Sequence, residues 1–329
     1  MTTQSTPNRF SHTPVMLTEV VELFGVVPAG VLVDATVGAG GHAQALLSSR
    51  DDLDLVGLDR DVQALAAATR TLEPFGERVT LRHARFDHLG EELASLGIAE
   101  VVGVLFDLGV SSPQLDVDER GFSYHRRGPL DMRMDSTQST TAAHVVNEYP
   151  EEDLVRILHT YGDERYAKRI AREIVRRRPL STTAELADAV RDAVPAAARR
   201  AGHPARRTFQ AIRIEVNSEL DVLPLALDQA IDALVPLGRC AVLSYHSGED
   251  RIVKEQFRAA AGEREPAPPR GLPVEPTIRA RVRLMGRRAR KPRAEEIVAN
   301  PRAESARLRA VEKLASTSAD RVQTKMVRG

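Results

Sequence analysis

Hydrophobic and polar residues follow a repeating order along the first third of this chain. Apolar, β-branched runs occur at 31–35, 53–58, 79–83 and 101–106, and segments with apolar residues at helical spacing lie between them at 42–48, 61–72 and 91–96. An amphipathic helix is also expected after Pro14. Strands that alternate with helices are typical of a doubly wound α/β domain with a parallel sheet.

The order changes from residue 142 to about 216, where apolar positions recur at helical spacing and no strand is indicated. Thr182-x-x-Glu185 matches a capping box, and Pro150 precedes acidic residues that favour a helix start. A helix, a strand and a second helix are expected again from residue 219 to 257. We therefore predict a sheet domain split into residues 1–115 and 217–329, with a long loop and an all-helical insertion at 116–216.

Composition narrows the class of protein. The 329 residues carry a formal net charge of zero and are 42% hydrophobic, which is ordinary for a soluble globular protein. Any surface that attracts nucleic acid must therefore be local. The single cysteine, Cys240, excludes a disulfide framework and favours a reducing cytoplasm. The sequence contains no signal peptide and no stretch long enough to cross a membrane, so no membrane partner is expected.

The segment VLVDATVGAGGHA joins an apolar run to a glycine-rich turn and a helix. Without Cβ atoms, Gly38, Gly40 and Gly41 let a ligand approach the backbone, and a helix start favours a negative group. Asp59 ends the next apolar run, where a carboxylate suits the ribose of either NAD or S-adenosylmethionine. Asp34 would repel a pyrophosphate but could pair with the ammonium group of S-adenosylmethionine. The segment favours S-adenosylmethionine, with a dinucleotide or a purely structural turn as alternatives.

Candidate ligand groups stand at the ends of four successive strands: Asp34, Asp59, Phe86 and Asp107. Because ligands of doubly wound sheets bind beyond the carboxyl ends of the strands, these side chains are expected to line one site.

The segment DLGVSSPQ begins at the end of the fourth strand. Asp107, Ser111, Ser112 and the carbonyl group before Pro113 could accept hydrogen bonds from an exocyclic amine. Such acceptors would help a weakly nucleophilic amine to attack a methyl group that is held in line with it. We therefore assign these residues as candidate catalytic groups. No metal-ligand spacing is present, so a metal is not expected.

The loop from 107 to 135 has no clear period, but it contains apolar and aromatic residues that argue for order. Phe122 or Tyr124 is a candidate platform for a flipped nucleobase, although both could simply pack the loop. Arg133 and His246 are further candidate substrate contacts. A histidine at a strand end is more often structural than catalytic.

Two segments are rich in basic residues. Eight Lys or Arg and no acid lie between Arg279 and Arg293. Another group lies on one expected helix: Arg165, Lys168, Arg169, Arg172, Arg176, Arg177 and Arg178. Each could contact an RNA backbone, or could be a solvated helix face or a basic tail.

Several blocks of the sequence resemble one known family. They are HTPVML, DATVGAGGHA, DLGVSSPQLD, RGFSY, PLDMRMD, RTFQAIRIEVNSEL, YHSGEDRIVK and NPRAESARLR. Together they resemble the MraW family of S-adenosylmethionine-dependent methyltransferases, which act on the N4 amine of a cytosine in the decoding region of small-subunit ribosomal RNA.

The resemblance implies a class I, Rossmann-like methyltransferase domain with an inserted helical domain. It implies 16S ribosomal RNA as the partner, within the small subunit, and leaves a homodimer open. It also implies that the basic segments meet RNA. The implied cofactor contacts, each in its matching block, are Gly40, Gly41, His42, Asp59, Phe86, Asp107 and Gln114.

Two positions depart from the family pattern. Arg127 stands where the family usually carries an acid, and Gly248 stands where a leucine is common. The first changes the charge of the expected substrate loop. Two other functions remain open on the sequence: an RNA-binding assembly factor with a relic pocket, and an NAD(P)-linked reductase. Calorimetry with S-adenosylmethionine, or fluorescence with NADH, would separate them.

Overall fold

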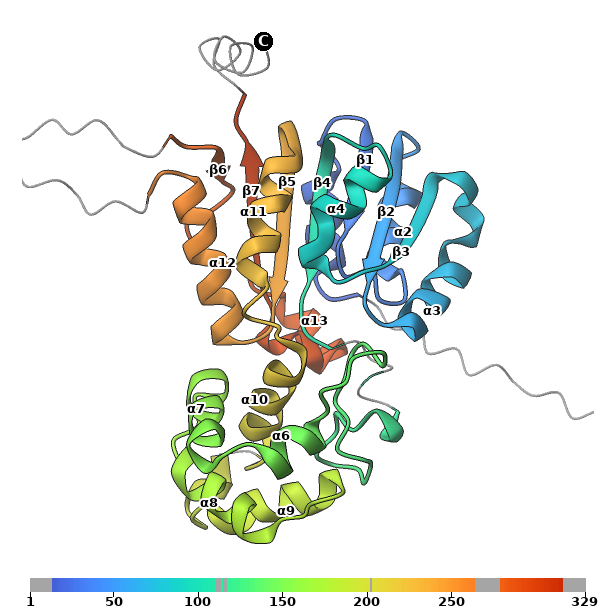
Figure 1. Cartoon of the computed structure of the whole chain (residues 1–329). Helices are drawn as coiled ribbons and strands as arrows, with labels where there is room; N and C mark the ends of the chain where they lie inside the picture. Colours follow the sequence, from blue (N-terminus) through green and yellow to red (C-terminus); the bar gives the residue numbers. More distant parts are fainter. Residues whose placement is uncertain (1–13, 111–113, 115–116, 202, 264–278, 316–329) are drawn as a thin grey trace, which may run out of the picture.

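The structure is a computed structural model that describes residues 14–110, 114, 117–201, 203–263 and 279–315. These residues form a sheet domain and a helical insertion, which lies beyond the carboxyl ends of the parallel strands (Figure 1).

Seven strands of the described chain form one sheet in the order β3-β2-β1-β4-β5-β7-β6. Strands β1 to β5 pair in parallel, and β7 runs antiparallel to both neighbours. The strand order reverses between β1 and β4, and ligands of such sheets bind at that point. The strands are β1 (Gly30–Asp34), β2 (Leu53–Asp59), β3 (Val79–His83), β4 (Val101–Asp107), β5 (Leu234–Ser244), β6 (Val282–Leu284) and β7 (Arg307–Lys313).

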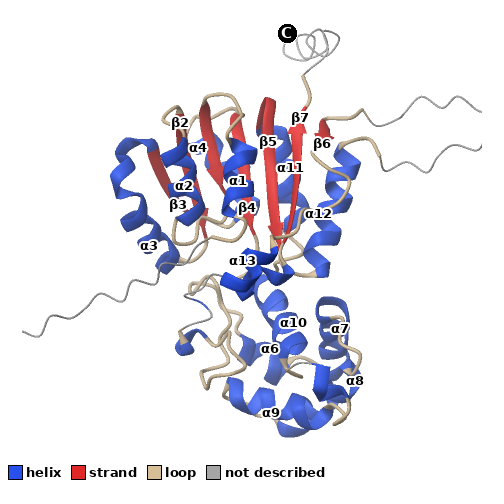
Figure 2. Ribbon diagram, turned by 180° about the vertical axis from the view of Figure 1, so that it is seen from behind, coloured by secondary structure: helices blue, strands red, loops and turns tan. Residues whose placement is uncertain are grey.

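Both faces of the sheet are covered by helices, because successive side chains of a strand point to opposite faces. Leu32 and Leu105 pack beneath α1 (Leu17–Phe24), α2 (Gly41–Ser49) and α3 (Val62–Leu72). Val33 and Val104 pack on the other face, beneath α4 (Leu89–Ser95), α11 (Leu223–Ala233) and α12 (Ser247–Ala260). Figures 1 and 2 show the two helical layers from opposite sides.

The insertion has an apolar core of its own, whose buried residues all lie between Phe122 and Val216. The predicted capping box is confirmed: Thr182 Oγ1 accepts the Glu185 N–H at 3.3 Å, and the Glu185 carboxylate accepts the Thr182 N–H at 3.2 Å. Its helices are α6 (Ala142–Glu148), α7 (Glu151–Gly162), α8 (Ala167–Arg177), α9 (Thr183–Ala193) and α10 (Arg206–Asn217).

The sheet is mixed, whereas the sequence predicted a parallel sheet followed by a basic segment. β6 lies within that basic segment, and β7 follows it. Glu312 of β7 is buried, and its carboxylate pairs with Arg239 at 2.8 Å and with Arg283 at 2.5 Å. Ion pairs occupy positions where a simpler strand would carry apolar residues, so the alternation that marks a strand is weak here.

The C-terminal part returns to the carboxyl edge of the sheet. There α13 (Ala294–Ala299) and the short 3-10 segment η5 (Pro301–Ser305) lie between the sheet and the insertion (Figures 1 and 2). The other 3-10 segments are η1 (Glu73–Arg78), η2 (Phe86–His88), η3 (Asp118–Arg120) and η4 (Ala198–Ala201). Among the described residues, no helix has the length and apolar character needed to cross a membrane.

Candidate active site

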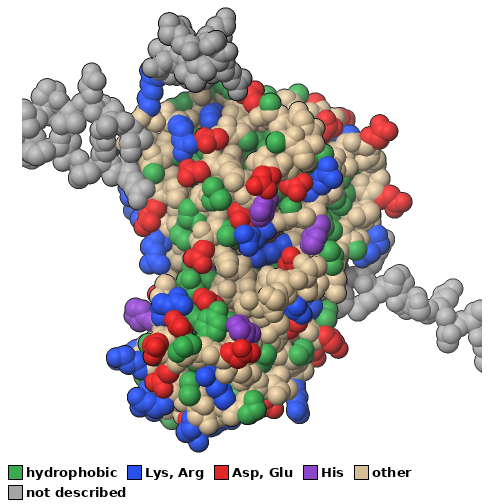
Figure 3. Space-filling model, viewed as in Figure 1, with side chains coloured by type: hydrophobic (Ala, Val, Ile, Leu, Met, Phe, Trp, Pro, Cys, Tyr) green, Lys and Arg blue, Asp and Glu red, His purple; other side chains and the backbone are tan. Residues whose placement is uncertain are grey.

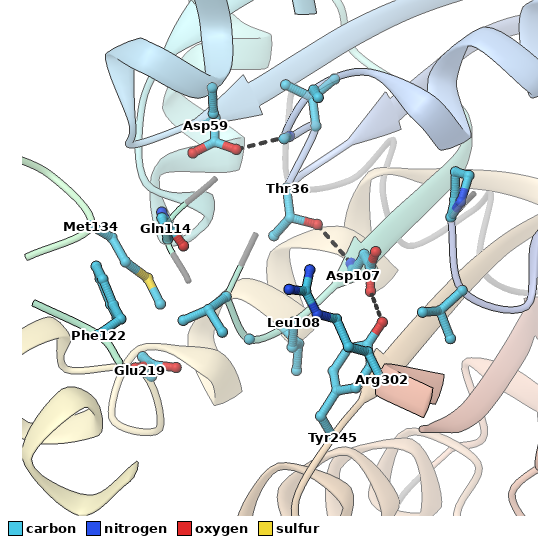
Figure 4. A pocket seen from close by; sticks show the side chains of 18 of the residues that line it. Thr36, Asp59, Asp107, Leu108, Gln114, Phe122, Met134, Glu219, Tyr245 and Arg302 are labelled. Atoms are coloured by element: carbon cyan, nitrogen blue, oxygen red, sulfur yellow. Dashed lines mark hydrogen bonds between the residues drawn. The ribbon is translucent and has the colours of Figure 1, made fainter. Parts of the chain in front are cut away.

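A cavity of about 1380 Å³ lies where the carboxyl edge of the sheet meets the insertion (Figure 4). Ligand pockets are usually 300–1,000 Å³, so this one has room for a cofactor and part of a second molecule. Most of the predicted site residues line it: Asp34, Gly38, Gly41, His42, Asp59, Phe86, Asp107, Gln114, Phe122, Tyr124 and His246.

The glycine-rich turn forms one wall of the cavity. Gly38 has a φ of 54° and donates its N–H to Asp59 Oδ2 at 2.9 Å, which ties the turn to the end of β2. Gly40 caps α2 with a φ of 85°, and a Cβ there would lie 3.1 Å from the Leu72 side chain. Gly40 does not itself line the cavity, so its part is to form the turn and to let α2 pack closely.

Asp34 and His42 form a buried, incompletely partnered pair beside this turn. Asp34 is 1% exposed and accepts only the Thr36 N–H at 3.2 Å among the described residues. Burial raises the pKa of Asp34 to about 7, although His42 opposes that rise. Neither ring nitrogen of His42 has a hydrogen-bond partner among the described residues. Asp34, which accepts one hydrogen bond, and His42, whose ring nitrogens make none within the part of the chain that the structure describes, both line the cavity and together indicate a polar ligand.

Asp107 is held in place from two sides. Its backbone N–H donates to Thr36 Oγ1 at 2.6 Å, and its Oδ1 accepts the Tyr245 hydroxyl at 2.7 Å (Figure 4). Burial, and then the neighbouring carboxylate, raise the pKa of Tyr245 well above 10, so the phenol stays a donor. Oδ2 lies 3.5 Å from His42 Nε2. The carboxylate therefore has a fixed orientation at the point where β4 meets the cavity.

Asp59 and Asp61 connect the sheet to the loop of the insertion. Asp59 Oδ1 accepts the Asp61 N–H at 2.9 Å, and burial raises the pKa of Asp59. Asp61 caps α3 through Gln63, and its Oδ2 accepts from Gln114 Nε2 at 2.9 Å and from Arg120 Nη1 at 2.8 Å. One buried carboxylate thus holds the two loop residues that approach the cavity from the far side.

Aromatic rings line both halves of the cavity. Phe86 packs edge-on against Phe106, with ring centroids 5.8 Å apart and an interplanar angle of 82°. On the insertion side, Phe122 is 6% exposed and belongs to the insertion core. Tyr124 packs edge-on against Phe209 with centroids 5.7 Å apart, and both line the cavity.

Arg133 and His246, both predicted to contact the substrate, make hydrogen bonds within the protein. Arg133 does not line the cavity: it pairs with Asp131 at 2.8 Å and donates to the carbonyl groups of Ser136 and Gln138. His246 lines the cavity, but it also caps α12, because its Nδ1 accepts the Glu249 N–H at 3.4 Å. Ser111, Ser112 and Pro113 lie outside the described residues.

The profile of one protein family, described as the MraW methylase family, matches residues 9–314. The chain is 54% identical over 316 residues to a protein of Mycobacterium sp. (strain KMS) named "Ribosomal RNA small subunit methyltransferase H", a match that covers 92% of this chain and 84% of that protein. The chain belongs to the MraW methylase family.

A relative of the same name from Thermobifida fusca is 53% identical over 311 residues, covering 92% of this chain and 93% of the relative. Likeness to solved structures is weaker. An rRNA methylase from Streptococcus thermophilus matches with a TM-score of 0.42 and 13% identity, over 91% of this chain and 95% of that one. So weak a likeness adds nothing to the assignment.

S-adenosylmethionine is the cofactor of MraW methylases, and the cavity fits it. When bound, it supplies an electrophilic methyl group. His42 would offer unsatisfied ring nitrogens and Asp34 a buried carboxyl group to its amino acid part, and Asp59 would offer a half-buried carboxylate to its ribose. The backbone at Gly38, where a Cβ would meet only the Thr36 carbonyl oxygen at 3.8 Å, would let it approach, whereas a Cβ at Gly41 would lie 2.6 Å from Pro14 Cγ.

Sequence analysis missed several residues that build this site. Arg60 donates to the Asn217 carbonyl at 2.8 Å and also contacts Met134 Sδ, and it lines the cavity. Arg213 makes a two-pronged ion pair with Glu219, at 2.8 and 2.9 Å. The signal was present, because Arg213, Asn217 and Glu219 belong to the family block RTFQAIRIEVNSEL.

The segment η5 was also missed as part of the site. Pro301, Arg302, Glu304 and Ser305 line the cavity, and Figure 4 places Arg302 beside Leu108 and Tyr245. These residues belong to the family block NPRAESARLR, for which the sequence predicted no role of its own.

Neither residue that departs from the MraW pattern lines the cavity. Arg127 is exposed, and its charge helps to lower the pKa of Glu185, after the hydrogen bonds that this carboxylate accepts. Gly248 is buried in the first turn of α12, where a Cβ would lie 3.1 Å from Leu220 Cδ1.

Many of the basic side chains are paired. Arg176 and Arg177 bind Glu173, and Arg178 donates to the carbonyl groups of Val146 and Tyr149. In the C-terminal segment, Arg281 pairs with two aspartates of α11. On the face drawn in Figure 3, Lys and Arg side chains lie among Asp and Glu side chains rather than in one continuous basic patch.

Proposed function

We propose that this chain transfers a methyl group from S-adenosylmethionine to the N4 amine of a cytosine in 16S ribosomal RNA, with the small subunit as substrate. The name of the relatives, "Ribosomal RNA small subunit methyltransferase H", supports the substrate class. The observation that carries the proposal is Asp107, a carboxylate of fixed orientation at the junction between the strand ends and the aromatic wall of the insertion.

Asp107 is the group that we assign to the amine. The lone pair of an exocyclic amine is delocalised into the ring, so the amine attacks poorly unless its N–H groups are held by acceptors. Tyr245 donates to Asp107 Oδ1, and Oδ2, which lies 3.5 Å from His42 Nε2, is the oxygen assigned to accept an N–H of the base. As the new N–C bond forms, the bond between the methyl group and the sulfonium sulfur would break and leave a neutral thioether. The amine then becomes acidic and gives up a proton, for which Asp107 Oδ2 is the assigned acceptor. Ser111, Ser112 and the carbonyl group before Pro113 are proposed as further acceptors.

The insertion would hold the flipped base. Flipping costs a few kcal/mol, and stacking on an aromatic ring offsets part of that cost. Phe122 and Tyr124 line the cavity on this side and are the proposed platform, and His246, which also lines the cavity, is a further proposed contact. Arg133, which pairs with Asp131, is proposed to act by holding the loop rather than by touching the base.

The test is methyl incorporation into small subunits that lack the modification. We expect Asp107→Ala to abolish turnover. Tyr245→Phe should lower kcat by about tenfold or more, because it removes a hydrogen bond to a charged group without changing the packing volume. Asp188→Ala, which removes an exposed carboxylate on α9, is the control and should behave as wild type. Normal turnover by Asp107→Ala would refute the role of Asp107, and no incorporation by the wild type would refute the substrate.

Three finer expectations remain predictions: a target in the decoding region, action in the cytoplasm and a homodimer. Mass mapping of methylated nucleotides in ribosomal RNA from cells without the protein would test the first. The proposed division at residues 115 and 216 is supported by the separate apolar core of the insertion.

A further inference from the structure

Three aromatic rings form a compact group at the insertion side of the cavity; we name Tyr124, His125 and His203 the ring triad. The ring centroid of Tyr124 lies 4.4 Å from that of His125 and 4.6 Å from that of His203, and the two imidazoles are 5.0 Å apart. Imidazoles on opposite faces of Tyr124 would be about 9 Å apart, twice a stacking distance. Both histidines therefore lie on the same side of the tyrosine.

Within the ring triad, Tyr124 packs into the insertion, whereas the two histidines are exposed to solvent. Tyr124 is half-buried and packs against Phe209 and the insertion core. His125 and His203 are exposed, and His125 lines the cavity. His203 is fixed by its own loop, because its Nδ1 accepts the Ala205 N–H at 3.3 Å. Two exposed imidazole rings thus pack against Tyr124, and one of them, His125, lines the cavity.

The charges around the triad favour an anion with a flat, uncharged part. Partial desolvation, and then the nearby His125, lower the pKa of His203, which favours the neutral form of its ring. Arg206 begins α10, lines the cavity and is exposed, and its guanidinium contacts no acceptor among the described residues. The residues of the insertion that line the cavity include no carboxylate: Phe122, Tyr124, His125, Met134, Arg206, Phe209, Gln210 and Arg213.

A ring platform next to an unpaired cation matches one nucleotide of single-stranded RNA, because bases stack on aromatic side chains while arginine binds phosphate. Of the two rings proposed for the flipped cytosine, Phe122 lies in the insertion core and Tyr124 also belongs to the triad, so the two exposed imidazoles lie next to the proposed cytosine site.

We propose that the ring triad and Arg206 bind the nucleotide next to the methylated cytosine, with its base stacked on the imidazoles and its phosphate on Arg206. This subsite rests on the proposed function, since it requires an RNA substrate. It takes any base, because stacking does not depend on base identity.

The first test compares His203→Leu with His203→Phe. Leucine keeps the bulk but removes the flat ring, whereas phenylalanine keeps a ring. With small subunits as substrate, we expect His203→Leu to raise KM by roughly 5- to 100-fold, the effect of losing one base stack, with kcat and the Kd of S-adenosylmethionine unchanged. His203→Phe should restore KM to near the wild-type value. A KM unchanged in His203→Leu, or raised equally by both variants, would overturn the stacking role.

The second test concerns Arg206. Arg206→Gln should weaken binding of a protein-free 16S RNA fragment and lower the slope of log K against log salt by about 0.7, the contribution of one phosphate on a single strand. Arg207→Gln is the matched control, because Arg207 donates to the Asp163 carbonyl and does not line the cavity. Equal slopes for the two variants would refute the phosphate contact. An effect seen on intact subunits but absent on protein-free RNA would assign this surface to a ribosomal protein instead.

The two proposals fail in different ways. If the wild-type protein methylates no small subunits, the proposed function is wrong. If it methylates them and the His203 and Arg206 variants match the wild type, only the flanking-nucleotide subsite is wrong.

Discussion

At the scale of single residues, one buried carboxyl group with a raised pKa is central to the cofactor side of the cavity. Asp34 is buried at the end of β1, and burial raises its pKa from 3.8 to about 7, with His42 opposing. Its protonated form is therefore populated at neutral pH in the empty protein. A ligand that carries an ammonium group favours the ionised form, so binding and deprotonation of Asp34 are coupled.

This coupling predicts a pH dependence for cofactor binding. Below pH 7 the carboxyl must lose its proton when a cation binds, so the affinity for S-adenosylmethionine should rise as pH increases from 5.5 to 7 and then level off. Asp34→Asn should bind weakly, with little slope over the same range. Isothermal titration calorimetry at several pH values measures both. A wild-type affinity that is flat across this window would contradict a role for Asp34 in pairing with the ammonium group.

Asp34 also affects the stability of the empty protein, with the opposite dependence on pH: rising pH favours cofactor binding but removes stability. A carboxyl whose pKa is higher in the folded than in the unfolded protein stabilises the fold fully below pH 3.8, and this contribution is lost as pH rises to about 7. The empty Asp34→Asn variant should therefore melt at a higher temperature than wild type at pH 8, with a smaller difference at pH 5. Scanning calorimetry without cofactor provides this comparison.

The predictability of the site differed sharply between residues. Asp34, Asp59 and Asp107 were found because carboxyl ends of parallel strands meet at one edge, so position along the sequence fixes position in space. Tyr245 could not be found that way. Its hydroxyl reaches Asp107 only because β5 pairs beside β4, and a tyrosine at a strand end carries no sign of that contact.

At the scale of elements, strands with apolar cores were predictable and strands with charged faces were not. β1 to β4 lie within about one residue of their predicted positions. β1, β2 and β4 are largely buried and read as apolar runs, whereas β3 is a partly exposed edge strand that is marked mainly by its β-branched start. β7 was missed because Arg309 and Glu312 face ion-pair partners, Asp250 among them. The missed strand matters, because η5 enters the cavity directly before it.

An ion pair connects the loop at residues 118–134 to the start of α3. Arg120 binds Asp61, at 13% and 4% side-chain exposure, and donates to the carbonyl groups of Arg133 and Met134 at 3.0 and 3.1 Å. A buried pair of this kind is costly to break from one side, because the remaining charge loses its partner.

We therefore expect Arg120→Met to destabilise the protein by about 3 kcal/mol and to speed amide exchange in residues 118–134. Arg126→Met is the matched control in the same loop: the Arg126–Asp118 pair is about half exposed, and its loss should cost under about 1 kcal/mol. Urea denaturation and hydrogen exchange measure the two effects. Equal losses for the two variants would show that Arg120 does not anchor the loop.

At the scale of the whole molecule, the two domains share a cavity but not a core. The apolar cluster of the insertion contains no residue from the sheet domain, although Val110 packs against it. Contacts that cross between the domains are largely polar, such as Arg60 to the Asn217 carbonyl and Ser247 to Asp163. A substitution that damages the insertion should therefore reduce RNA methylation more than it reduces the affinity for the cofactor.

Paired core truncations test this separation. Ile170→Ala in α8 and Leu105→Ala in β4 each remove a fully buried aliphatic group, at a cost of about 2–5 kcal/mol. We expect Ile170→Ala to keep the affinity for S-adenosylmethionine within about threefold while methylation of small subunits falls, because its damage stays within the insertion core. Leu105→Ala should weaken cofactor binding as well, since β4 carries Asp107 to the cavity. If Ile170→Ala weakened cofactor binding as much as Leu105→Ala, the molecule would unfold as one cooperative unit, and the insertion would stabilise the cofactor site as well as presenting RNA to it.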